Sequence, residues 1–192
     1  MQSLLSQIRS CTICESNLPK GANPIISVVE TSKIALISQA PGLIAHKSGI
    51  PWNDPGGKRL KNWLGVSDTE FYDQNNFAIV PMGLCYPGKG NSGDLPPRPE
   101  CAPLWHNTIF NFLKNLQLII LIGSYSQQYY LKENVKSNLT ETVKSYEDYL
   151  PKYFPIPHPS PRNRFWCSNN PWYEKEVIPQ LQSRIRQIIT NH

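Results

Sequence analysis

The residues with the clearest chemical potential lie near the C-terminal end, in Pro157-His158-Pro159-Ser160-Pro161-Arg162-Asn163. Prolines at alternate positions fix φ and bias their neighbours toward extended backbone, which predicts a stiff, non-helical ribbon. A hydroxyl and a guanidinium held close together can bind a phosphate, and a neutral imidazole N–H can stabilise a developing anion. Taken alone, the stretch is equally consistent with a proline-stiffened surface turn that happens to carry a histidine.

The cysteines form a second candidate site. Cys11 and Cys14 are a C-x2-C pair, Cys85 and Cys101 are a looser pair, and Cys167 stands alone beside a tryptophan. Two pairs far apart in the sequence suit a four-thiolate site that holds an iron–sulfur cluster or tetrahedral zinc. Zinc ribbons usually have two tight pairs, so the loose second pair favours iron–sulfur. The alternative is no metal, because buried thiols without a ligand role are common.

Composition sets broad limits on the protein. The chain has 192 residues, and 19 Lys and Arg against 14 Asp and Glu give a net charge of +5, which is compatible with an anionic partner without identifying one. The N-terminus lacks the apolar run of a signal peptide, and no segment is long and apolar enough to span a bilayer. We therefore expect a soluble cytoplasmic protein without a membrane partner, a setting that argues against a disulfide framework.

The elements that must position these residues alternate along the chain. Short apolar runs predict buried strands at 32–38, 77–80, 118–123 and 153–156, and helical spacing predicts helices at 1–9, 58–65, 105–116, 124–132 and 174–189. This alternation predicts one three-layer α/β/α domain over 1–192, with a central, mostly parallel four-stranded sheet. Ligands of such sheets bind beyond the carboxyl ends of the strands, where the unusual loops of this chain lie. The long loop at 86–103 is expected to be functional or tied down.

Several segments resemble motifs of the uracil-DNA glycosylase superfamily and occur in the same order along the chain. Ser38-Gln39-Ala40-Pro41-Gly42 is similar to the water-activating loop of that family. The segment 49–57, Gly-Ile-Pro-Trp-Asn-Asp-Pro-Gly-Gly, resembles the one that places an aromatic ring beside the flipped base. His158-Pro159-Ser160 matches the second motif, and the cysteine spacing is similar to the iron–sulfur branch usually called family 4. The resemblance covers most of the chain and implies a monomeric DNA repair glycosylase that hydrolyses the N-glycosidic bond of uracil or another deaminated base in DNA.

The resemblance also assigns roles to residues. His158, Asp54 and Gln39 are the catalytic candidates: His158 would donate to the departing base, and the other two would position water or stabilise the sugar. Residues 163–165 are candidates for a wedge that fills the place of the flipped nucleotide. The cofactor implied is an iron–sulfur cluster, [4Fe-4S] by resemblance, with Cys11, Cys14, Cys85 and Cys101 as ligands. The substrate-binding candidates are Ala40, Pro41, Gly42, Trp52, Met82, Ser160, Arg162 and Asn163.

The chain departs from the family pattern at two places. Gln39-Ala40 stands where the best-known members carry an acid, and Pro81-Met82-Gly83-Leu84 replaces a stretch with the asparagine that reads the uracil edge. Asp54 can substitute for the acid, although a helix N-cap explains it equally well, and Trp52 is also a common kind of core residue. The alternatives left open are a catalytically weakened module that binds uracil-DNA and an iron–sulfur protein that acts on a nucleotide or another small substrate.

Overall fold

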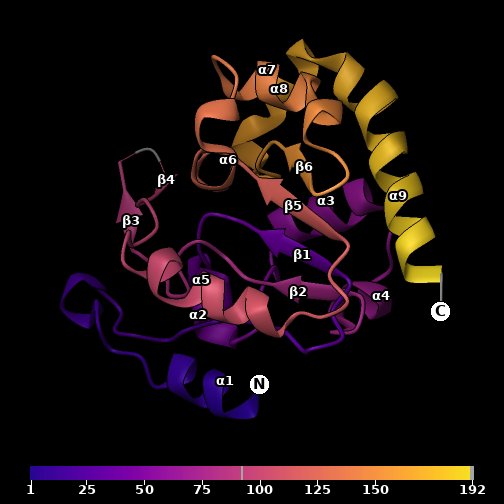
Figure 1. Ribbon diagram of the computed structural model, residues 1–192. Helices are drawn as coiled ribbons and strands as arrows, with labels where there is room; N and C mark the ends of the chain where they lie inside the picture. The colour runs from indigo at the N-terminus through magenta and orange to yellow at the C-terminus, as the bar shows by residue number, and fades with distance from the viewer. Residues whose placement is uncertain (92, 191–192) are drawn as a thin grey trace.

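The computed structural model describes residues 1–91 and 93–190 and contains the predicted alternation of strands and helices (Figure 1). Ser92, Asn191 and His192, which the predicted domain includes, lie outside the described residues. The strands are β1 (Ile34–Ile37), β2 (Phe77–Ile79), β3 (Lys89–Gly90), β4 (Gly93–Asp94), β5 (Leu118–Ile122) and β6 (Tyr153–Ile156). The helices are α1 (Gln2–Arg9), α2 (Leu43–Ser48), α3 (Pro55–Leu64), α4 (Asp68–Tyr72), α5 (Cys101–Phe112), α6 (Ser124–Leu131), α7 (Leu139–Lys144), α8 (Arg164–Asn169) and α9 (Ile178–Thr190).

The central sheet has four strands in the order β2-β1-β5-β6, and every neighbouring pair is parallel. All four strands are buried or nearly so, which explains their continuous apolar sequences. The predicted sheet is thus confirmed. β3 and β4 form a separate antiparallel hairpin, which projects at the left of Figure 1.

Helices cover both faces of the sheet. Successive side chains of a strand point to opposite faces, and because both sets are apolar here, each face must be buried. Ile34 and Leu36 of β1 face a core built with α3 and α9. Ala35 and Ile37 face the opposite core, built with α1, α5 and α6. The molecule therefore has the three α/β/α layers that the sequence predicts.

The chain between β2 and α5 differs most from prediction. The loop predicted at 86–103 contains the β3–β4 hairpin, and α5 begins at Cys101, four residues earlier than expected. Pro103 does not prevent this, because the first turn of a helix needs no internal hydrogen bond from its N–H. The short helices α2, α4, α7 and α8 were not predicted, since none is long enough for a clear apolar period. α4 is instead defined by a capping box between Ser67 and Glu70.

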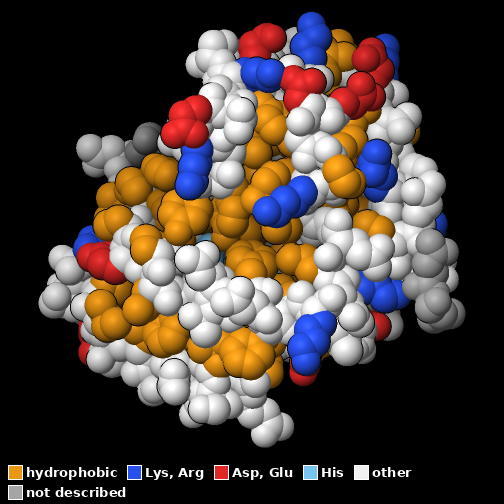
Figure 2. Space-filling model, in the orientation of Figure 1, with side chains coloured by type: hydrophobic (Ala, Val, Ile, Leu, Met, Phe, Trp, Pro, Cys, Tyr) orange, Lys and Arg blue, Asp and Glu red, His pale blue; other side chains and the backbone are white. Residues whose placement is uncertain are grey.

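The surface mixes apolar and charged regions. The face seen in Figure 2 carries a broad apolar area across its middle, with lysine, arginine and acidic side chains interspersed around it. Within residues 1–91 and 93–190, no helix has both the length and the apolar character required to cross a membrane.

Candidate functional site

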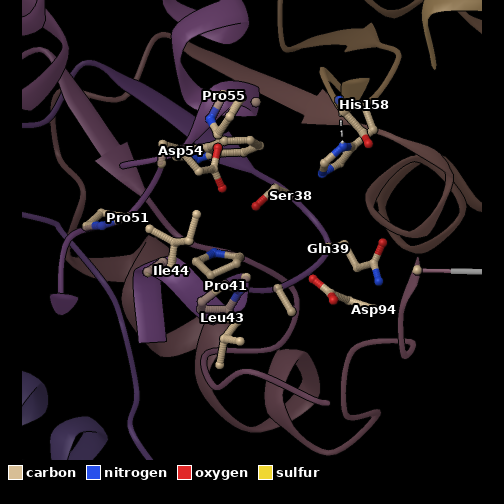
Figure 3. Close-up of a pocket in the computed structure, with 18 of the residues that line it drawn as sticks. Ser38, Gln39, Pro41, Leu43, Ile44, Pro51, Asp54, Pro55, Asp94 and His158 are labelled. Carbon is tan, nitrogen blue, oxygen red and sulfur yellow. Dashed lines mark hydrogen bonds between the residues drawn. The ribbon is translucent and has the colours of Figure 1, made fainter. Parts of the chain in front are cut away.

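A cavity of about 540 Å³ opens beyond the carboxyl ends of β1, β2 and β6. Parallel strands bring their following loops to one edge of the sheet, so segments far apart in the sequence meet there. The loop after β1, the segment before α3, the β3–β4 hairpin and the ribbon after β6 all line the cavity (Figure 3). Of the residues predicted to act or to bind substrate, it is lined by Gln39, Ala40, Pro41, Gly42, Trp52, Asp54, His158, Ser160, Arg162 and Asn163.

His158 is partly buried and points into this cavity (Figure 3). The backbone N–H of Ser160 donates to its Nδ1 at 3.2 Å, so the neutral imidazole carries its proton on Nε2. The Nδ2 of Asn163 donates to the His158 carbonyl at 2.8 Å and holds the ribbon in place. Burial lowers the pKa of His158, while the nearby Asp54 carboxylate acts in the opposite direction. The ring is thus a neutral N–H donor near neutral pH.

Trp52 lies beside His158, with 5.7 Å between the ring centroids and 36° between the ring planes. Its backbone is in the left-handed region, with φ of 58°, which is unusual for a bulky residue. Gly57 makes this conformation possible, because a Cβ at that position would lie 1.7 Å from the Trp52 carbonyl oxygen. The glycine pair at 56–57 therefore allows a turn that directs the indole toward the cavity.

Asp54 caps α3 and also lines the cavity. Its Oδ1 accepts a hydrogen bond of 2.7 Å from the Gly57 N–H and caps α3. Its other oxygen, Oδ2, lies 3.8 Å from the position of a Cβ on Gly42, in the wall of the cavity. One oxygen thus serves the helix and the second faces the site.

Gln39 ties the loop after β1 to the β3–β4 hairpin. Its Nε2 donates to the Leu95 carbonyl at 2.8 Å, next to Asp94, which also lines the cavity. Figure 3 shows the Gln39 and Asp94 side chains close together on one side of the pocket. Sequence reasoning missed Asp94. The only available signal was the length of the glycine-rich loop that carries it.

The rim of the cavity is formed by the residues that follow His158. The Ser160 hydroxyl accepts from the Arg162 N–H at 3.3 Å, and Arg59 of α3 donates to the Ser160 carbonyl at 3.2 Å. Phe165, on α8 directly after this turn, is 82% exposed. An exposed aromatic ring beside a cleft is available for contact with a ligand.

Met82 does not line the cavity. Its side chain packs in the core beside α5, and the neighbouring Pro81 occupies the wall instead. The carbonyl of Pro81 accepts from Nε2 of the buried His106, whose Nδ1 is paired with the Tyr130 hydroxyl. Since a carbonyl only accepts, His106 must carry its proton on Nε2 and receive the tyrosine hydrogen on Nδ1. His106 thus holds part of the cavity wall from behind.

The four cysteines predicted as ligands lie close enough together for the charge of one thiolate to affect the pKa of its neighbours. The thiols of Cys14 and Cys101 share a hydrogen bond, and Cys11 and Cys14 both act on Cys85 and Cys101. Burial, and then these neighbours, raise the pKa of Cys85 to about 12 and that of Cys101 to about 11. Among the described residues, no group of three or more His, Cys, Asp or Glu side chains forms a ready site for a single metal ion. Cys167 packs against the core beside α9 instead.

Comparison with known families agrees with this arrangement. Residues 27–182 match the model of the family described as the uracil DNA glycosylase superfamily. The matched region includes β1, β2, β5 and β6 and all the residues that line the cavity except Ile25. Because the match extends over most of the sequence, the chain belongs to the uracil DNA glycosylase superfamily.

Proposed function

We propose that this chain is a monomeric, monofunctional DNA glycosylase that hydrolyses the N-glycosidic bond of uracil or another deaminated base in DNA. The observation that carries the proposal is a cavity in which an imidazole N–H and an indole lie side by side. A base within a duplex stack cannot reach these groups, so the nucleotide must be flipped into the cavity. Water is the nucleophile, and no covalent lysine intermediate forms.

In this proposal His158 stabilises the departing base. Breaking the bond leaves negative charge on the base and positive charge on the sugar. The Nε2–H donates to the O2 atom of the base as its charge grows, and a donor fixed in advance is worth more than one that must reorient. The bond from Ser160 to Nδ1 supports this role, because it sets the tautomer and holds the ring.

Trp52 stacks on the flipped base, a contact worth about 1–3 kcal/mol for aromatic side chains. The Oδ2 of Asp54 faces the same space and stabilises the positive charge that develops on the sugar. The Nε2 of Gln39 is engaged by Leu95, so its Oε1 is the atom that orients water.

Ser160, Arg162 and Asn163 grip phosphates on either side of the flipped nucleotide, and Phe165 serves as the wedge. Phosphate contacts of this kind position DNA without reading its sequence.

We further propose that the chain belongs to the iron–sulfur branch, family 4, and that Cys11, Cys14, Cys85 and Cys101 hold a [4Fe-4S] cluster. Four neighbouring thiols fit a soft metal centre. When bound, the cluster would anchor both ends of the loop that carries the β3–β4 hairpin.

The test of the activity is an excision assay on oligonucleotides that carry uracil, hypoxanthine, xanthine or a mismatched thymine, single-stranded and in duplex. Alkali then cleaves any abasic site. We expect cleavage for at least one deaminated base and no borohydride-trapped adduct. His158→Ala should lower the single-turnover rate by about 10²–10³-fold while DNA affinity is kept. Strands that stay intact at high protein concentration would refute the proposal.

The second candidate is a catalytically weakened module of the same fold, which the Gln39-Ala40 departure motivates. Tight, salt-dependent binding to uracil-DNA without base release would favour it over the enzyme. For the cofactor, absorbance near 400 nm and iron and sulfide analysis distinguish a cluster from zinc. A colourless protein that contains zinc, or no metal, after anaerobic purification would refute the cluster.

A further inference from the structure

The cavity contains a carboxylate that the family resemblance does not assign. Among the described residues that line it, the carboxylates are Asp54 and Asp94. Asp54 has committed Oδ1 to the N-terminus of α3. Asp94 lies on β4 and carries no such helix cap.

The fold brings Asp94 to the site by two connections. In the β3–β4 hairpin, Asp94 lies opposite Lys89, so the register of the hairpin determines its position. Gln39 then joins the hairpin to the loop after β1 through its 2.8 Å bond to the Leu95 carbonyl. Gln39, which stands where the best-known family members carry an acid, thus holds the hairpin so that Asp94 lies beside the loop after β1 (Figure 3).

The two carboxylates lie close to the same residue, Gly42. A Cβ on Gly42 would lie 3.7 Å from Oδ2 of Asp94 and 3.8 Å from Oδ2 of Asp54. The two oxygens thus converge on one part of the cavity wall. Asp94 is exposed at the rim, where water has access, while His158 occupies the inner wall.

We propose that Asp94 is the catalytic base that takes a proton from the attacking water, an inference that rests on the proposed glycosylase function. In this step the water oxygen forms a bond to C1′ of the sugar. The C1′–N bond breaks, and its electron pair leaves on the base, where His158 stabilises the charge. The proton of the water passes to Asp94 and then through solvent to the released base, so one water is consumed and no other reactant is needed.

The surroundings of Asp94 suit this role. Although Asp94 as a whole is exposed, its carboxyl group is partly desolvated where it faces the cavity; this desolvation is the largest effect and raises its pKa, and Asp54 raises it further. Arg162 of the ribbon and Lys89 of β3 lower the pKa of Asp94. Burial, and then the charge of Asp94, raise the pKa of the nearby Tyr86 hydroxyl. A carboxylate with a raised pKa is a stronger base, and its protonation should make excision fall on the acidic side of the pH profile.

The experiment measures single-turnover excision and DNA affinity of the purified protein across a range of pH, on the base that the wild type removes best. Asp94→Asn keeps the size of the side chain and removes its basicity. Asp94→Glu keeps a carboxylate, and Asp148→Asn is a matched control on an exposed aspartate that pairs with Lys136 outside this cavity. Circular dichroism checks that each variant is folded.

We expect Asp94→Asn to lower the excision rate by about 100-fold or more and to lose the acidic limb, whereas Asp94→Glu keeps that limb. The DNA affinity of Asp94→Asn should equal or exceed that of the wild type, because a negative charge near Arg162 has been removed. Such a result would show that the slower excision is not caused by weaker binding. Asp148→Asn should match the wild type. An Asp94→Asn rate within about threefold of the wild type, or an acidic limb lost only in Asp54→Asn, would overturn the inference while leaving the glycosylase proposal intact. A wild type that releases no base from any substrate would overturn both.

Discussion

The buried His106 should make the protein measurably less stable in mild acid. Its Nε2–H is bonded to the Pro81 carbonyl and its Nδ1 to the Tyr130 hydroxyl, and its side chain is almost completely buried. Charging this ring would place a cation in a largely apolar cluster, and the tyrosine hydroxyl would have to change from donor to acceptor. Burial accordingly lowers the pKa of His106 from 6.5 to about 4.

The sign and size of the effect follow from this pKa. Between about pH 6.5 and 4, the unfolded chain takes up a proton that the folded chain refuses, so the free energy of unfolding falls as the pH is lowered. For the pKa values above, His106 alone should cost about 2 kcal/mol between about pH 7 and 5. The carboxylate of Glu70, with a pKa lowered to about 2, loses its contribution only in stronger acid.

The assay is urea unfolding followed by circular dichroism at both pH values. Burial lowers the pKa of His158 as well, so the wild type must be compared with a variant that loses the His106 imidazole and keeps that of His158. The pair His106→Phe and Tyr130→Phe, made together, removes both polar partners and keeps aromatic contact with Phe110. We expect this variant to lose about 2 kcal/mol less than the wild type on acidification. An equal loss in both proteins would refute the reasoning.

Three further predictions concern residues around the cavity. Asp54→Ala should lower the free energy of unfolding by about 0.5–2 kcal/mol, whereas Asp54→Asn, which can still cap α3, should not; equal urea midpoints for the two would contradict the cap. Gly57→Ala should displace the Trp52 backbone, since the new Cβ would overlap its carbonyl, and both thermal stability and excision should fall; a wild-type melting temperature would be the contrary result. Arg162→Gln should reduce the slope of log affinity against log salt by about 0.9, as for one lost phosphate contact, and an unchanged slope would remove Arg162 from the grip.

The regular elements were largely predictable because their signals are local. The apolar runs that became β1, β2, β5 and β6 are continuous, as burial on both faces of a parallel sheet requires. α3 ends at Leu64, and Gly65 directly after it adopts the left-handed conformation expected of a helix stop. The hairpin at β3 and β4 was not predictable, because strands of two residues have no measurable apolar period.

Part of the candidate site was likewise predictable from the sequence, and part was decided only by tertiary structure. Sequence motifs identified His158, Trp52 and Asp54 as site residues. The spacing of apolar residues, together with the positions of proline and glycine, predicted the type of fold, because these signals act over only a few residues. Which atoms face the cavity was decided only by tertiary structure. The tautomer of His158, the division of the Asp54 oxygens and the arrival of Asp94 beside Gln39 depend on hydrogen bonds between segments far apart in the chain. Such contacts form only when the parallel strands have brought their loops to one edge of the sheet.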